Sequence, residues 1–375
     1  MLARPIDCEL RLESPDVFLG SPREDGANKC VTGHLALQLR KPTLIRSIKV
    51  QLRGTLKIHS KPLLTNISPR KKELIRNDRE VITFDVTKSL AISETGKPFK
   101  LQRGSHSFRF EIFIDKPLFE TVDGLDSASH SYQVHGIIER PWGNQQIITK
   151  PLIIYGNYEN DQYLSWLVPN EYYDPLVLQK ALNDIHYEII LPARDIPFGA
   201  MFPAHIRLLS DMKSLYVKHI MVKVIETHNF EIPATAFEQT NYNVRFLRSQ
   251  KTRFVTGDDV PLLPGSYSAR EDVTPGDNWE ITSTLALPRQ LQDCIQSARL
   301  PYLDIKHFLS VEIALQVADD LVTINETVPF RIFMPASPVN SAFGPGAPQM
   351  NLRELWVAPP PYGKHETDSL LADSC

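Results

Sequence analysis

The amino-acid sequence predicts an all-β protein of two tandem immunoglobulin-like β-sandwich domains, followed by a disordered C-terminal tail. Three observations support this fold class. Segments in which apolar and polar residues alternate recur along the chain and are separated by turn residues. The 375 residues are too many for one ordinary domain and fit about two. The sequence shows no sustained helical spacing of apolar residues except at Arg289–Ala298, where we expect a short helix.

Half-buried antiparallel strands account for the first half of the chain. The longest candidate is Ile45–Ile58, in which Ile48, Val50 and Leu52 share one face and predict a buried side. Pro and Gly residues separate this candidate from its neighbours, as turns require. The other strand candidates of this half are His34–Leu39, Val81–Val86, Phe108–Ile114, Tyr132–Ile138 and Gln146–Tyr155.

The second half repeats the pattern and contains a faint internal duplication. The segment that begins at His34 resembles the segment that begins at His205, 171 residues later. Ile48–Leu52 resembles Ile220–Val224 at an offset of 172 residues, which favours two copies of one domain type. The strand candidates of this half are Ile185–Leu191, His205–Leu209, Val217–Ile225, Asn243–Val255, Trp279–Leu287, Ile305–Gln316 and Val322–Phe333.

These patterns divide the chain into four parts. We place the first sandwich at residues 1–155, an aromatic and acidic connector at 156–175, and the second sandwich at 176–335. Residues 336–375 begin with a stretch rich in Pro, Gly, Ala and Ser. This last part has too little apolar area to offset the entropy of ordering, so we expect a disordered tail.

Composition and motifs exclude several classes of protein. The formal net charge of -3 argues against a nucleic-acid binder. The four cysteines include no CxxC pair, which predicts no metal site and a reducing compartment. We expect no signal peptide and no membrane span, because no apolar run is long enough, and we find no catalytic or phosphate-binding motif in the sequence. We therefore expect a cytoplasmic protein that is not an enzyme and needs no cofactor.

Six segments together resemble the α-arrestin family, the arrestin-related trafficking adaptors that are common in fungi. In the first half they are VTGHLALQLRKPTLIRSIKVQLRGTLKI from Val31, GSHSFRFEIFI from Gly104 and SYQVHGIIERPW from Ser131. In the second half they are FPAHIRL, SLYVKHIMVKVIE and IKHFLSVEIAL. The resemblance implies two arrestin-like sandwiches. It also implies an adaptor that brings a HECT-type ubiquitin ligase with WW domains to membrane transporters or receptors at the plasma membrane and endosomes, promoting ubiquitination and endocytosis.

The sharpest local motif lies in the predicted tail. Pro359, Pro360, Pro361 and Tyr362 form a PPxY sequence. The prolines preset an extended polyproline II backbone, which a WW domain clamps between aromatic rings while the tyrosine fills an adjoining pocket. A proline-rich piece of tail can match this pattern by chance, but its place in an arrestin-like chain favours function.

A basic face is the second candidate site. If Ile48 and Val50 face the core, every second residue of the same strand points outward and forms a cationic row. Such a face can attract acidic cargo or an anionic membrane surface, although a solvated strand face has the same pattern. The row consists of Lys49, Arg53 and Lys57, and a nearby loop adds Arg70, Lys71 and Lys72.

Two kinds of modification site are also predicted. Ser68 precedes Pro69 and the basic loop, so a proline-directed kinase could add a phosphate that masks this loop, although Ser-Pro also favours turns. The family resemblance implies that the recruited ligase modifies the adaptor itself. Candidate acceptors in the second sandwich are Lys180, Lys213 and Lys306.

A retromer-type coat or sorting subunit is the alternative function, because it also pairs two arrestin-like sandwiches. The PPxY motif discriminates between the two functions, since a coat subunit does not need to recruit a ligase. A hydrolase or lectin on a sandwich scaffold has no supporting set of residues in the sequence.

Overall fold

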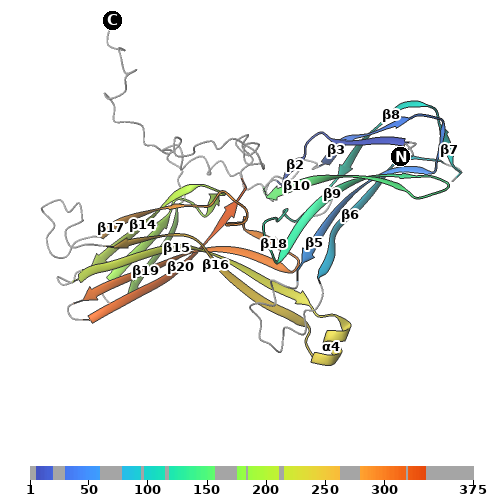
Figure 1. Cartoon of the computed structure of the whole chain (residues 1–375). Coiled ribbons are helices and arrows are strands. Elements are labelled where there is room, and N and C mark those ends of the chain that lie inside the picture. The colour runs from blue at the N-terminus through green and yellow to red at the C-terminus, as the bar shows by residue number, and fades with distance from the viewer. Residues whose placement is uncertain are drawn as a thin grey trace, which may run out of the picture. The chain divides into compact units, whose positions relative to one another are not determined.

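A computed structural model places two β-sandwiches one after the other along the chain (Figure 1). The predicted all-β fold class is therefore confirmed. The predicted tail lies outside the described residues, as does nearly all of the connector. The structure describes residues 6–19, 30–59, 78–93, 97–114, 118–156, 175–182, 185–210, 215–261, 279–317 and 320–334.

The first sandwich packs a three-stranded sheet against a five-stranded sheet. Neighbouring strands pair antiparallel, except that β2 and β10 are parallel. The smaller sheet has the order β1 (Ile6–Leu12), β3 (Cys30–Leu39), β8 (Gly104–Phe113). The larger sheet has the order β2 (Asp16–Leu19), β10 (Gln146–Gly156), β9 (Ala128–Glu139), β5 (Ser47–Ile58), β6 (Arg79–Ile92). A short pair, β4 (Thr43–Ile45) and β7 (Phe99–Leu101), stands apart.

The core of this sandwich follows the predicted alternation. Ile48, Val50 and Leu52 are fully buried, as the pattern of their strand predicts. Gly54 continues the same buried phase, because the Tyr132 ring occupies the space that a side chain would need. The predicted strand 45–58 is interrupted at Arg46, which separates β4 from β5.

The second sandwich packs a four-stranded sheet against a larger one. The first sheet has the order β11 (Leu176–Leu182), β12 (Ile185–Leu191), β14 (Met201–Ser210), β17 (Trp279–Ala286). The other has the order β13 (Asp195–Pro197), β20 (Asp320–Phe333), β19 (Leu303–Val317), β15 (Leu215–Pro233), β16 (Phe246–Pro261). β18 (Ala298–Leu300) pairs with one end of β19.

The two sandwiches have the same strand order, which confirms the predicted duplication. The order β1-β3-β8 recurs as β12-β14-β17, and β2-β10-β9-β5-β6 recurs as β13-β20-β19-β15-β16. His34 in β3 and His205 in β14 therefore occupy equivalent strands. Ile48 in β5 and Ile220 in β15 do the same, and both are fully buried.

The predicted helix at Arg289–Ala298 is wrong. This segment makes a turn and then extends into β18, because its backbone groups bond elsewhere. The Ile295 N–H donates to the Glu226 carboxylate, and the Ser297 N–H donates to the Ile332 carbonyl. The apolar residues that suggested a helix are buried here by an extended segment. Its consecutive residues Cys294, Ile295 and Gln296 are all buried.

A helix that the sequence analysis missed, α4 (Ala236–Tyr242), joins β15 to β16. Its N-cap is Thr235, whose side chain accepts from the Glu238 N–H while the Glu238 carboxylate accepts from the Thr235 N–H. Its C-cap is Asn243 in the left-handed conformation, with φ of 51°. The predicted strand 243–255 therefore starts later, at Phe246.

Residues from both sandwiches share one buried apolar cluster. Leu56 and Ile58 of β5 belong to it together with Phe230 and Ile232 of β15. The Gln296 side-chain amide adds a polar contact by donating to the Thr121 carbonyl at 2.6 Å. No helix among the described residues is long and apolar enough to cross a membrane.

Candidate functional site

The predicted basic row lies on the outward face of β5, where each cation stands beside a carboxylate. The Lys49 ammonium is 3.0 Å from the Glu139 carboxylate on β9. The Arg53 guanidinium is 3.8 Å from that of Asp85 on β6. Lys57 is exposed and lies opposite Glu80 in the register of β5 with β6. The row therefore has the predicted orientation, and neighbouring acidic residues offset its charge.

Glu139 shows how firmly one of these carboxylates is held. Hydrogen bonds from Ser47, at 2.6 Å, and from Lys49 keep the pKa of Glu139 below its usual range. Glu139 is therefore ionised at neutral pH and stays paired with Lys49. The other predicted members of the basic face, Arg70, Lys71 and Lys72, lie outside the described residues, as does Ser68.

The candidate ubiquitin acceptors stand in different surroundings. The Lys180 ammonium is 2.7 Å from the Glu326 carboxylate, and that of Lys306 is 2.7 Å from the Asp304 carboxylate. Both side chains are about half exposed, so an ion pair does not hide either amine. Lys213 lies outside the described residues, as do Pro359, Pro360, Pro361 and Tyr362.

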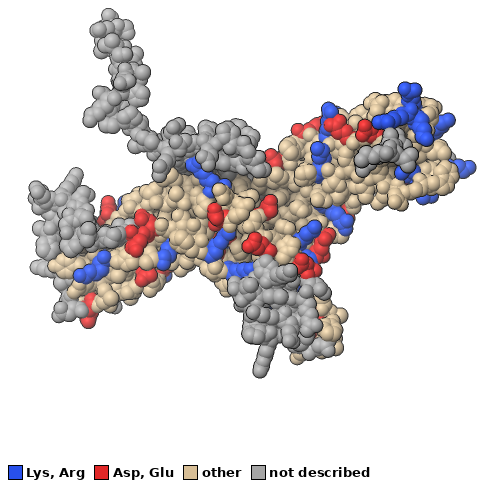
Figure 2. Space-filling view, in the orientation of Figure 1, with Lys and Arg blue, Asp and Glu red and all other residues tan. Residues whose placement is uncertain are grey.

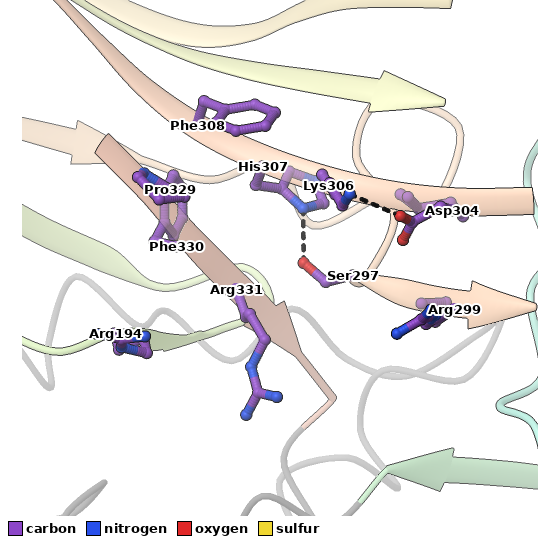
Figure 3. A pocket seen from close by; sticks show the side chains of 12 residues that line it. Arg194, Ser297, Arg299, Asp304, Lys306, His307, Phe308, Pro329, Phe330 and Arg331 are labelled. Atoms are coloured by element: carbon purple, nitrogen blue, oxygen red, sulfur yellow. Dashed lines mark hydrogen bonds and ion pairs between the residues drawn. The ribbon is translucent and has the colours of Figure 1, made fainter. Parts of the chain in front are cut away.

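The second sandwich has a groove that the sequence did not indicate (Figure 3). Its volume is about 510 Å³, and its apolar wall includes Phe308, Pro329 and Phe330. Its basic residues are Arg194, Arg299, Lys306 and Arg331. Two of these cations are already paired, because Lys306 contacts Asp304 and the Arg331 guanidinium donates to Asp195 at 2.6 Å. The groove therefore offers apolar surface with a partly neutralised basic rim.

A buried polar cluster lies behind this groove and is built on Glu226, which is fully buried. Its carboxylate contacts the His228 imidazole, the Arg253 guanidinium at 2.8 Å and the His307 imidazole at 3.1 Å. The Ile295 N–H donates to it at 2.9 Å. Burial acts to raise the pKa of Glu226, but the hydrogen bonds from His228 and His307 outweigh burial and hold the pKa well below its usual range.

His307 is neutral in this cluster, because burial lowers its pKa more than the contact with Glu226 raises it. The Ile332 N–H donates to the Ser297 hydroxyl at 3.0 Å. We therefore assign the Ser297 hydroxyl as donor to His307 Nδ1, 2.8 Å away, and His307 Nε2–H as donor to Glu226. Figure 3 shows the contact between His307 and Ser297 as a dashed line.

The donor set of this cluster also includes a thiol. One donor atom each from Glu226, Cys294 and His307 lie within 4.8 Å of one another, a set that can ligate a transition metal. The Glu226 carboxylate, however, already faces two imidazoles, a guanidinium and a backbone N–H. Burial also raises the pKa of the Cys294 thiol far above its usual range, which disfavours the thiolate that a metal needs. The geometry thus favours a structural cluster that joins β15, β16 and β19.

A signal for this cluster exists in the sequence. In β15 the buried phase runs Val222, Val224, Glu226, His228, Phe230, so two polar residues stand where the alternation calls for apolar ones. His307 occupies the buried phase of β19 in the same way. The groove has no such signal, because its cations come from separate segments of the chain.

Comparison with known families matches both sandwiches. The family described as Arrestin (or S-antigen), N-terminal domain, matches residues 16–159. The family described as Arrestin (or S-antigen), C-terminal domain, matches residues 182–337. Together the two matches cover most of the chain.

Curated fungal relatives align along almost the whole chain. A HECT-type ubiquitin ligase-interacting protein creD from Emericella nidulans is 22% identical over 375 residues, covering 97% of this chain and 60% of the relative. Probable proteins of the same name from Aspergillus clavatus and Aspergillus terreus are each 23% identical, covering 59% and 62% of the relatives. The chain therefore spans about 60% of the length of the curated relatives it matches.

Proposed function

Because the chain belongs to the α-arrestin family, we propose that it is a non-enzymatic adaptor that joins a HECT-type ubiquitin ligase to membrane cargo. The two family matches and the name of the fungal relatives support this proposal. The cargo would be a transporter or receptor, and its ubiquitination would lead to endocytosis. The adaptor would act in the cytoplasm, at the plasma membrane and on endosomes.

One observation carries the ligase half of the proposal, the PPxY motif at Pro359–Tyr362. A WW domain clamps the ridge formed by the first two prolines between aromatic rings and accepts the tyrosine in a second pocket. Proline restricts the unbound peptide to conformations close to the bound one, which lowers the entropy cost of binding. The motif can therefore bind without the support of a folded domain.

The number of residues between the motif and the second sandwich suits an adaptor. Pro359 follows Met334, the last described residue, by 25 positions. A fully extended chain of that length spans at most about 80–90 Å. This reach would let a ligase bound at the motif approach cargo held by the sandwiches. One motif gives weak binding, so clustered cargo or a second contact would raise the effective concentration.

A ligase-recruitment experiment with the full chain tests this function. We expect an isolated WW domain of a HECT-type ligase to capture the chain, and Tyr362→Ala to abolish capture. Pro345→Ala is the matched control, because it removes a proline of the same region outside the motif. Equal capture of the wild type and the Tyr362→Ala variant would overturn the role of the motif.

The cargo half needs a separate measurement in cells. Membrane proteins that co-purify with the chain should carry ubiquitin when the wild type is expressed and lose most of it with Tyr362→Ala. The same membrane proteins should still co-purify with the variant, because the substitution leaves the sandwiches intact. Unchanged ubiquitination of these proteins would contradict ligase recruitment by this adaptor.

A further inference from the structure

The strand registers bring three connections together at one end of the first sandwich. Leu39 at the end of β3 pairs with Gly104 at the start of β8. Ser47 at the start of β5 pairs with Ile92 of β6 and with Glu139 of β9. The connections β3–β5, β6–β8 and β9–β10 must therefore lie at the same end. We call residues 40–46, 97–103 and 140–145 of these connections the cationic end.

Hydrogen bonds tie these three connections to one another. The Arg46 N–H donates to the Glu139 carbonyl at 2.8 Å, which joins the first connection to the end of β9, where the third connection begins. The β4–β7 pair joins the first to the second, with Thr43 opposite Leu101. The cationic end is therefore one surface, and side chains from all three connections can act on the same partner.

This surface is strongly basic, and Glu139, which borders its third range, is paired with Lys49. Its ranges contain seven basic residues and no acidic residue. Figure 2 shows Lys and Arg gathered at the end of the first sandwich that carries β7. No ion pair with a described residue is formed by these side chains. The seven are Arg40, Lys41, Arg46, Lys97, Lys100, Arg103 and Arg140.

Apolar side chains project from the same surface. Trp142 in the β9–β10 connection is 76% exposed, and Leu44 in β4 is 40% exposed. Ile92, which pairs with Ser47 at this end, is 62% exposed. An exposed tryptophan on a surface rich in Arg and Lys is the combination that favours a membrane–water interface, because the indole is amphipathic.

A small polar hollow completes the surface. It has a volume of about 420 Å³ and is lined by Arg46, Glu139, Arg140, Gly143, Asn144 and Gln145. Because Lys49 pairs with Glu139, the guanidiniums of Arg46 and Arg140 leave the hollow with a net positive charge that can attract an anionic headgroup.

We propose that the cationic end docks on an anionic lipid bilayer, with its Lys and Arg side chains on the headgroups and Trp142 and Leu44 in the interface. The seven cations are spread over three connections around projecting apolar side chains, which fits a plane of charge better than a single acidic peptide. This inference deepens the proposed adaptor function and rests on it, because an adaptor for membrane cargo must work at a bilayer.

Vesicle flotation with the full chain tests the proposal. We expect binding to phosphatidylcholine vesicles that contain phosphatidylserine, little binding to phosphatidylcholine alone, and loss of binding as salt rises. Each surface cation contributes about fivefold in affinity. The triple variant Arg40→Ala, Lys41→Ala, Arg103→Ala should therefore bind about a hundredfold more weakly, and all three side chains are exposed.

A second triple variant controls for net charge. Lys218→Ala, Arg245→Ala, Arg299→Ala removes three exposed cations from the second sandwich. It should bind the vesicles almost as the wild type does. Trp142→Ala should weaken binding and abolish quenching of tryptophan fluorescence by brominated lipids. Equal loss in the two triple variants, or no binding of the wild type at low salt, would overturn the proposal.

Two further measurements distinguish membrane docking from ligase recruitment and from binding to a protein partner. Capture by a WW domain should be unchanged in the first triple variant. Capture without vesicle binding would therefore overturn only the membrane contact, and vesicle binding without capture would overturn only ligase recruitment. Binding of the cationic end to a polyglutamate peptide, with no binding to vesicles, would assign it to a protein partner instead.

Discussion

Glu238 accepts two hydrogen bonds from the Arg79 guanidinium, at 2.7 and 2.9 Å, while it also completes the capping box of α4. Both side chains are largely buried, with 8% of Glu238 and 19% of Arg79 exposed. One carboxylate thus links β6 of the first sandwich to the start of a helix in the second. Burial acts to raise the pKa of Glu238, but the hydrogen bonds from Thr235 and Arg79 outweigh it and lower the pKa.

Removing this charge should destabilise the folded chain. We expect Glu238→Gln to lower the free energy of unfolding at pH 7 by about 2–4 kcal/mol, because it leaves Arg79 poorly paired. Urea unfolding provides the measurement. Glu231→Gln is the control, since it disrupts an exposed pair with Arg248 at 2.7 Å, worth less than about 1 kcal/mol. Equal losses in the two variants would contradict the buried linkage.

Acid should destabilise the second sandwich through the Glu226 cluster. Glu226 and His307 both have folded pKa values below their usual ones. As pH falls, the unfolded chain therefore binds more protons than the folded chain. The stability that these two groups contribute at neutral pH is then lost, beginning near the pKa of about 6.5 that histidine has in the unfolded chain. Melting temperatures measured from pH 7.5 to 5 should fall in the wild type. His307→Gln should lower the melting temperature at pH 7.5 and should reduce its fall between pH 7.5 and 5. An unchanged dependence of the melting temperature on pH would contradict the role of His307.

The basic row of β5 is best tested by neutralisation. Charge reversal would place new carboxylates against Glu139 and Asp85 and disturb the sheet. We expect Lys49→Gln with Arg53→Gln to weaken binding of an acidic peptide several-fold at low salt and to leave the fold intact. Binding is measured by fluorescence anisotropy. Unchanged affinity would mean that the row is a solvated strand face.

The motif at Pro359–Tyr362 should bind as an isolated peptide. We expect micromolar affinity for a WW domain, about -8 kcal/mol, which one short preorganised motif can reach. Tyr362→Ala should remove most of this affinity, and Pro360→Ala should weaken it by removing one ring from the clamp. Isothermal titration of the three peptides decides the matter. Equal affinities would mean that the motif is incidental.

Ubiquitin should also reach the adaptor itself. Lys180 and Lys306 are each about half exposed, so neither amine is shielded from a ligase. We expect mass spectrometry to find the ubiquitin remnant on at least one of Lys180, Lys213 and Lys306 in cells with active ligase. Lys→Arg substitution at the modified site should remove it. The absence of a remnant at all three positions would contradict this prediction.

The strands were predictable because one period governs them. Ile48, Val50 and Leu52 alternate with polar residues. Because successive side chains of a strand point to opposite faces, this alternation predicts a half-buried strand. The helix α4 has only seven residues, too few to display a period of 3.6. The sequence signal for this helix is the Thr235–Glu238 capping box, which apolar periodicity does not reveal.

The sites were less predictable because they depend on contacts between distant residues. Glu226 could have been found as a carboxylate in the buried phase of a strand, but Arg253, Cys294 and His307 come from separate segments. The acidic neighbours of Lys49 and Arg53 likewise lie on β9 and β6. Their positions follow from strand pairing, which alternation along a single strand does not reveal.

The parallel strand pairs bear on the order in which the chain folds. Asp16 of β2 pairs with Ile153 of β10, and Asp195 of β13 pairs with Arg331 of β20. Each sandwich thus joins an early strand to its last one, a contact of long sequence separation that slows folding. During synthesis the first sandwich can close once β10 has left the ribosome. The second must wait for β20, and until then β19 exposes an unpaired edge that a neighbouring chain or a chaperone can bind.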